Sequence, residues 1–82
     1  MSAKEIKYEV VKHIGVVSES ENYTKELNLV AWNGRKPTFD LRVWKRGKDN
    51  TSMPLKGVSM NTDDILVLKE LLSNLNLENE DE

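Results

Sequence analysis

Residues 26–44 read ELNLVAWNGRKPTFDLRVW, and this stretch decides the fold. On either side of Asn33-Gly34, apolar residues recur at every second position, over residues 25–32 and again over residues 38–44. A period of two is that of a strand with one buried face. Asn-Gly between two such runs is the strongest short-range signal of a hairpin. We therefore expect two antiparallel strands, joined by a turn that Pro37 lengthens because proline cannot donate to a ladder.

Weaker patterns flank this hairpin. Residues 8–17 are rich in valine and isoleucine, and residues 55–60 form a short apolar run after a polar stretch, 46–54, that is typical of a loop. The period then becomes helical, with Asn61 as N-cap and Asp64 three residues later. The sequence therefore predicts an α+β fold, a four-stranded antiparallel sheet followed by one C-terminal helix (ββββα). We expect the helix to cover the face of the sheet that carries the leucines.

The predicted helix is apolar over more of its surface than one sheet face needs. A chain of 82 residues hides only about 60–65% of its unfolded surface, so its core is marginal. Both observations favour a homodimer in which the helices meet. The predicted interface residues are Leu68, Leu71, Leu72 and Leu75.

Composition excludes several kinds of site. The chain has no cysteine and one histidine, His13, which excludes disulfides, thiolate metal sites and multi-histidine metal sites. We interpret His13 as a partly buried strand residue. Asp63-Asp64 is the only internal pair of acids, and its place at a helix N-terminus accounts for it. Neither GxxxxGK[ST] nor GxGxxG occurs. We therefore expect no enzyme activity, no metal, no cofactor and no small-molecule substrate.

Charge divides the chain unevenly. The net charge of −2 comes from 12 basic and 14 acidic residues. Residues 25–56 hold eight of the bases and three acids, whereas residues 78–82 hold four acids. We predict a flexible N-terminus at 1–7, a domain at 8–76 and a disordered acidic tail at 77–82. No apolar run approaches the roughly 18–20 residues of a membrane span and no signal peptide is evident, so we expect a cytoplasmic protein without a membrane partner.

The basic middle of the chain also holds both tryptophans. Trp32 and Trp44 fall on the strand positions opposite the leucines, as does Arg42. Aromatic rings interleaved with bases on a sheet are typical of surfaces that bind single-stranded nucleic acid, because bases stack on the rings and phosphates pair with the cations. Other interpretations stay open at this point. The tryptophans equally fit a core or a subunit interface, Arg42 equally fits a pair with Asp40, and the surface suits RNA or a protein partner as well as DNA.

Three motifs resemble those of the positive cofactor four family, most closely its bacterial YdbC-type branch. They are an aromatic-x-Gly-basic turn at 32–35, an Asp-aliphatic-Arg-x-aromatic strand at 40–44, and Lys-Gly-aliphatic-Ser-x-Asn at 56–61; the opening at 8–18 is similar too. Members of this family are single-stranded-DNA-binding transcription coactivators. The resemblance implies a curved sheet, a homodimer, and binding of single-stranded DNA with little sequence preference.

The resemblance also implies site residues and a cellular role. Trp32 and Trp44 match the stacking aromatics, and Arg35, Arg42 and Lys56 match family bases. With the other bases of the middle segment, the predicted nucleic-acid-binding residues are Lys25, Trp32, Arg35, Lys36, Arg42, Trp44, Arg46 and Lys56. The expected role is in transcription regulation, replication or repair, in the bacterial cytoplasm or nucleoid. RNA remains an alternative ligand. The acids follow the domain here, whereas eukaryotic members carry theirs before it, so coactivation of a eukaryotic machinery is not implied.

Overall fold

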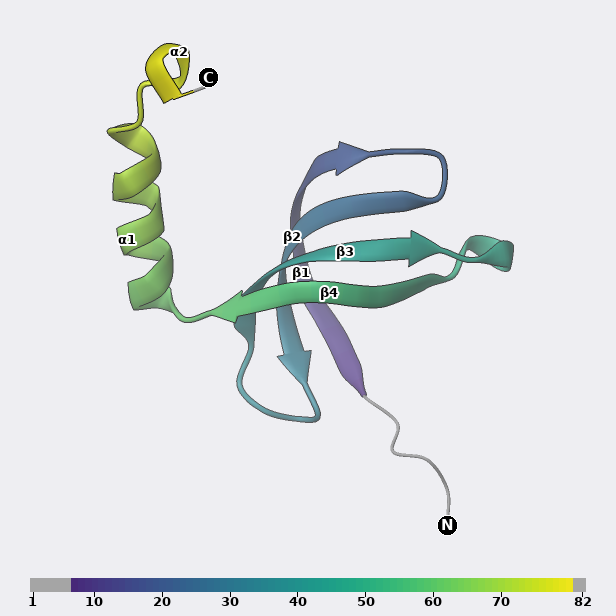
Figure 1. The fold of residues 1–82 in the computed structure, drawn as a ribbon. Coiled ribbons are helices and arrows are strands. Elements are labelled where there is room, and N and C mark those ends of the chain that lie inside the picture. The colour runs from purple at the N-terminus through teal and green to yellow at the C-terminus, as the bar shows by residue number, and fades with distance from the viewer. Residues whose placement is uncertain (1–6, 81–82) are drawn as a thin grey trace.

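The four predicted strands form one antiparallel sheet in the computed structural model, which describes residues 7–80 (Figure 1). The strands lie side by side in chain order, β1-β2-β3-β4, and one longer helix follows them. The predicted ββββα order is therefore confirmed. The elements are β1 (Tyr8–Glu19), β2 (Tyr23–Trp32), β3 (Thr38–Arg46), the 3-10 turn η1 (Lys48–Asn50), β4 (Ser52–Met60), α1 (Thr62–Ser73) and α2 (Leu77–Glu80).

The turn between β2 and β3 forms where the sequence predicts it. Asn33 and Gly34 both have positive φ, 52° and 77°, the left-handed conformation that asparagine and glycine tolerate best. Asn33 also fixes the start of the chain, because its backbone N–H donates to the Lys7 carbonyl (2.6 Å) and its Oδ1 accepts from the Lys7 N–H (3.1 Å). Of the segment 1–7 that we predict to be flexible, only Lys7 belongs to the described residues, so this stays a prediction.

The predicted loop at 46–54 is shorter in the structure. Strand β4 begins at Ser52, so only residues 47–51 connect it to β3. Polar side chains misled the prediction, because the first residues of β4 pair with the end of β3 while remaining mostly exposed; Arg46 pairs with Ser52 and Lys45 with Met53.

Helix α1 begins at the predicted cap. Asn61 Oδ1 accepts from the Asp64 backbone N–H (2.8 Å), and Asp64 Oδ2 accepts from the Asn61 N–H (3.2 Å), which is a complete capping box. The helix does not cover the leucine-bearing face as expected. It stands beside the sheet at the end of β4 (Figure 1) and has no buried residue. A single residue, Asn61, separates β4 from α1, which leaves no connection long enough to fold the helix back.

A second helical turn, α2, forms at Leu77–Glu80. This turn lies inside the segment 77–82, for which the predicted disorder stays a prediction. Asn76 accounts for the turn, since its Oδ1 accepts from the Glu78 backbone N–H (3.1 Å) in the way that a helix cap does. Residues 81–82 lie outside the described residues.

The two faces of the sheet are buried in an unexpected way. We call the face of the even-numbered residues of β2 and β3 the polar face, and that of the odd-numbered residues the leucine face. The buried residues of the described chain all lie on the polar face: Thr24, Asn28, Val30, Asp40 and Trp44. The leucines and Phe39 of the leucine face are only half-buried.

Curling of the sheet explains the burial of the polar face. Trp32 and Trp44 lie near opposite ends of the β2–β3 ladder, yet the Tyr8 ring contacts both, with centroids 5.5 and 5.6 Å away. The Tyr8 hydroxyl also donates to the Ser52 carbonyl (3.4 Å), so the two edge strands approach each other across this face. Three register shifts in β1 supply the bending, since bulges increase local twist.

Candidate nucleic-acid interface

An aromatic cluster of Tyr8, Trp32 and Trp44 lies on the polar face. Tyr8 is tilted against Trp32 and meets Trp44 edge to face, both favourable arrangements for aromatic pairs. The guanidinium carbon of Arg42 lies 4.7 Å from the centre of the Trp32 ring, within the range of a cation–π contact. Strands β1, β2 and β3 therefore each contribute one ring to the cluster.

The guanidinium of Arg42 is fixed by hydrogen bonds to Asp40 and to the Leu55 carbonyl. Its Nε and NH2 donate to Oδ1 and Oδ2 of Asp40 (2.8 and 2.7 Å), and its NH1 donates to the Leu55 carbonyl (2.7 Å). Asp40 is 0% exposed and also accepts from Ser59 Oγ (3.1 Å). The pKa of Arg42 is raised above its ordinary value, mainly by the hydrogen bonds to Asp40. Burial of the guanidinium lowers the pKa, and the negative charge of Asp40 raises it further.

This pairing corrects the predicted role of Arg42 as a phosphate ligand. Its side chain is 16% exposed, and each of its nitrogens already donates to the protein. Arg42 therefore positions Trp32, and the alternative that the sequence left open, a pair with Asp40, is the one found.

Trp44 also differs from its prediction. It is 4% exposed, so its ring face cannot stack on a base in this conformation, and it instead supports Tyr8 from beneath. Trp32 is half-buried and Tyr8 is 37% exposed, which makes these two the accessible rings of the cluster. The sequence reasoning missed Tyr8, because only the pairing of Tyr8 with Trp32 across β1 and β2 brings it there.

A row of polar side chains continues along the same face. Glu26 Oε2 accepts from Thr24 Oγ1 (2.6 Å), and Glu26 Oε1 accepts from Asn28 Nδ2 (3.3 Å). His13, on β1, lies with Nδ1 2.7 Å from Asn28 Oδ1 and 3.7 Å from Glu26 Oε1. The side chain of His13 is 54% exposed, so this strand histidine is about half-buried.

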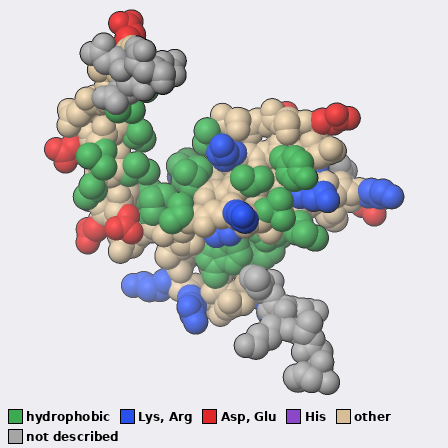
Figure 2. Space-filling model, viewed as in Figure 1, with side chains coloured by type: hydrophobic (Ala, Val, Ile, Leu, Met, Phe, Trp, Pro, Cys, Tyr) green, Lys and Arg blue, Asp and Glu red, His purple; other side chains and the backbone are tan. Residues whose placement is uncertain are grey.

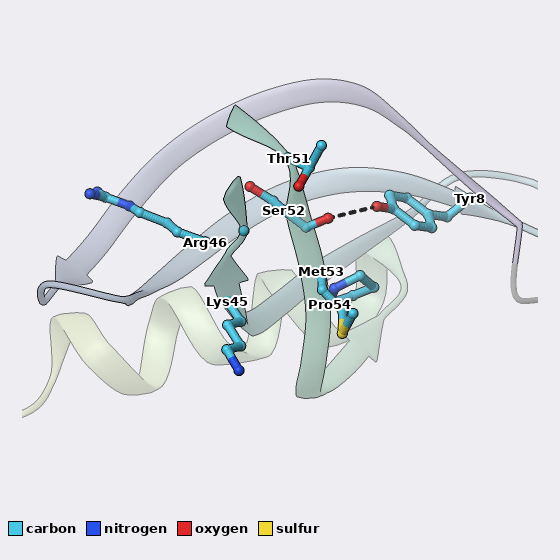
Figure 3. A pocket seen from close by; sticks show the side chains of 8 residues that line it. Tyr8, Lys45, Arg46, Thr51, Ser52, Met53 and Pro54 are labelled. Carbon is cyan, nitrogen blue, oxygen red and sulfur yellow. Dashed lines mark hydrogen bonds between the residues drawn. The ribbon is translucent and has the colours of Figure 1, made fainter. Parts of the chain in front are cut away.

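Two adjoining hollows cross the polar face, and both are lined by Tyr8 and Ser52. One, of about 290 Å³, extends over His13, Glu26 and Asn28. The other, of about 570 Å³, extends to the end of the β3–β4 hairpin, where Lys45 and Arg46 reach out in different directions (Figure 3). All four strands contribute side chains to this depression.

The predicted basic residues divide between the faces. Arg46 lies beside the hollow and forms an exposed ion pair with Glu19 (3.1 Å), and Arg35 and Lys36 are exposed in the turn that follows Trp32. Lys25 and Lys56 lie on the leucine face: Lys25 pairs with Val43, and Lys56 lines a separate hollow with Val43. Strand alternation separates them from the aromatic cluster, so the structure does not bring these two predicted residues together with the rings.

Comparison with known proteins finds one similar sequence. No protein-family model matches it. Within the described residues, no helix is long and apolar enough to cross a membrane. The chain is similar to an uncharacterized protein of Treponema pallidum (strain Nichols), with 35% identity over 72 residues that cover 87% of this chain and 81% of the relative. The chain therefore belongs to the same family as this Treponema pallidum protein.

Proposed function

We propose that the protein binds single-stranded DNA along the polar face, largely without sequence preference and without catalysis. The observation that carries this proposal is the aromatic cluster at the edge of the hollow. Two rings, those of Tyr8 and Trp32, stay accessible there, while Arg42 and Trp44 hold them in place. Unpaired bases offer ring faces that stack on such aromatics, and a duplex does not.

The phosphates of the bound strand pair with the exposed bases at the ends of the hollow. Arg35 and Lys36 lie beyond Trp32, and Arg46 lies at the opposite end. The ion pair of Arg46 with Glu19 is exposed on both sides, and exposed pairs contribute little stability. A phosphate can therefore take the place of Glu19 at low cost.

The resemblance of the motifs at 32–35, 40–44 and 56–61 to the positive cofactor four family supports the same proposal. On that basis we place the protein in the bacterial cytoplasm, with a role in transcription, replication or repair. RNA and protein partners are the competing ligands. RNA differs at the 2′-hydroxyl, so matched DNA and RNA oligonucleotides separate the first of these.

The direct test is a titration of tryptophan fluorescence with a 20-nucleotide single strand and with the corresponding duplex. We expect strong quenching by the single strand alone. With about three phosphates neutralised, log K should fall against log salt with a slope of about −2. Arg46→Gln should reduce that slope by about 0.7, whereas Lys69→Gln on α1 should leave it unchanged. Equal quenching by the duplex, or a flat salt dependence, would contradict the proposal.

We also propose that the protein is a homodimer. Val30 and Trp44 are the only buried hydrophobic residues among those described, and so small a core cannot offset the conformational entropy lost on folding. Hydrophobic side chains instead appear along α1 and over the sheet in Figure 2. The predicted interface residues fit this role: Leu71, Leu72 and Leu75 are exposed and Leu68 is half-buried.

Leu71 provides the test of the dimer, since its side chain is 62% exposed in the single chain. Leu71→Gln should shift the protein toward a monomer or an unfolded chain in sedimentation experiments. Lys69→Gln introduces the same side chain on the same helix and should leave the mass unchanged. A wild-type protein that sediments as a stable monomer would refute the dimer.

A further inference from the structure

Glu26 is an unexpected residue in a surface that would bind a polyanion. Its carboxylate lies in the smaller hollow of the polar face, beside Tyr8 and Trp44. Phosphate would be repelled from it, so whatever enters this hollow is the part of a nucleotide that carries no charge. The walls contributed by Tyr8 and Val10, both exposed, suit the flat faces of a nucleobase.

The orientation of Glu26 is fixed before any ligand arrives. Thr24, which is buried, donates to Oε2, and Asn28, also buried, donates to Oε1. A carboxylate oxygen has two acceptor positions, so each oxygen of Glu26 keeps one for a ligand. Glu26 therefore lines the hollow with a carboxylate that buried neighbours hold in place and that keeps one acceptor position on each oxygen.

The hydrogen-bond network also determines which ring nitrogen of His13 carries the proton. Asn28 uses its Nδ2 to donate to Glu26, so its Oδ1 faces His13 Nδ1 at 2.7 Å. An oxygen accepts, and Nδ1 must therefore carry the proton. In the neutral ring Nε2 is then an acceptor. His13 and Glu26 thus both present acceptors, and the ligand edge that matches them is rich in donors.

We infer that this pocket, formed by His13, Glu26 and Asn28 beside Tyr8, takes one unpaired nucleobase and prefers guanine; the inference rests on the proposed binding of single-stranded DNA. The Watson–Crick edge of guanine carries two adjacent donors, N1–H and the N2 amino group, which match the two oxygens of a carboxylate. Adenine and cytosine offer one amino group beside an acceptor nitrogen. Thymine offers one N–H between two carbonyl oxygens and is the least suited.

The test compares 19-nucleotide thymine strands that carry guanine, adenine, cytosine or thymine at the central position. Binding is followed by fluorescence anisotropy of the labelled strand. The guanine strand should bind about fivefold more tightly than the all-thymine strand, which is the lower end of what a bidentate base contact contributes. A single guanine avoids the association of guanine-rich strands.

Glu26→Gln tests the residue itself, because glutamine keeps the size but replaces one acceptor by a donor. The ratio of guanine to thymine affinity should fall to about one. Glu21→Gln, an exposed position with the same change of charge, should keep the ratio even if it tightens all strands. Equal affinity of the wild-type protein for all four strands would overturn the base pocket and leave single-strand binding intact. Absence of binding to any strand would overturn both. The wild-type series decides the matter even if Glu26→Gln fails to fold.

Discussion

Replacement of Asp40 by asparagine should be among the most destabilising single changes of charge in the sheet. Asp40 is fully buried, and its two oxygens accept three hydrogen bonds, two from Arg42 and one from Ser59. Asparagine has nearly the same size, so the change adds no cavity. It removes the negative charge and turns one acceptor into a donor that faces another donor.

The expected cost follows from these contacts. Breaking a buried ion pair by removing one partner costs about 3–5 kcal/mol, because the remaining charge stays buried without compensation. Arg42 keeps 16% of its side chain exposed and retains its bond to the Leu55 carbonyl. Both features reduce the free-energy cost of leaving Arg42 without its partner. We therefore expect Asp40→Asn to lower the free energy of unfolding by about 3 kcal/mol, the lower end of that range.

The measurement is urea denaturation followed by circular dichroism, at one fixed protein concentration since a dimer's stability depends on it. Glu19→Gln is the matched control: it removes the carboxylate of the other arginine pair, with Arg46, which is exposed on both sides. That change should cost less than about 0.5 kcal/mol. If the two variants lose equal stability, burial of the Asp40–Arg42 pair does not govern its energy and the reasoning fails.

Two further changes test the packing and the helix cap. Gly57→Ala should lower the free energy of unfolding by about 1–3 kcal/mol, because the added Cβ would meet Arg42 Cβ and lie 2.6 Å from the Leu41 carbonyl oxygen. Gly15→Ala is the control, since nothing lies within 4 Å of the added Cβ, and it should change the urea midpoint little. Equal losses of stability in the two variants would contradict close packing at Gly57. Asn61→Ala should cost about 1 kcal/mol through loss of the capping box, read as a lower melting temperature of the helical signal, and an unchanged melting curve would show that the cap is dispensable.

Features that depend on neighbours in the chain were predictable from the sequence. The turn at Asn33-Gly34 and the cap at Asn61 each rest on residues within three positions of one another, and both appear where expected. Alternation likewise identified β2 and β3 and divided their residues correctly between two faces. Local signals of this kind do not require knowledge of the rest of the fold.

Which face is buried was not predictable, because the answer depends on residues far apart. Apolar alternation suggests that the leucine face is the core, whereas the curl of the sheet buries the polar face instead. That curl is visible only in contacts such as Tyr8 with Ser52, 44 positions away. For the same reason the sequence did not show that Arg42 and Trp44 support the accessible rings of Tyr8 and Trp32. Trp44 is buried, and Arg42 packs against the Trp32 ring.

The unequal burial of the two faces implies that one face stabilises the fold and the other recognises the ligand. A polar face closed by ion pairs and hydrogen bonds gains little net stability, since buried pairs barely offset their own desolvation. The main hydrophobic stabilisation must then come from the leucine face and α1, whose apolar side chains are half-buried or exposed in one chain. If a second copy covers them, folding depends on that side of the molecule and ligand recognition on the other. Changes at Leu71 should therefore reduce stability and DNA binding together, whereas Glu26→Gln should alter base preference while the dimer persists. A variant of Leu71 that unfolds no more easily than wild type, yet is monomeric, would break this link between dimerisation and folding.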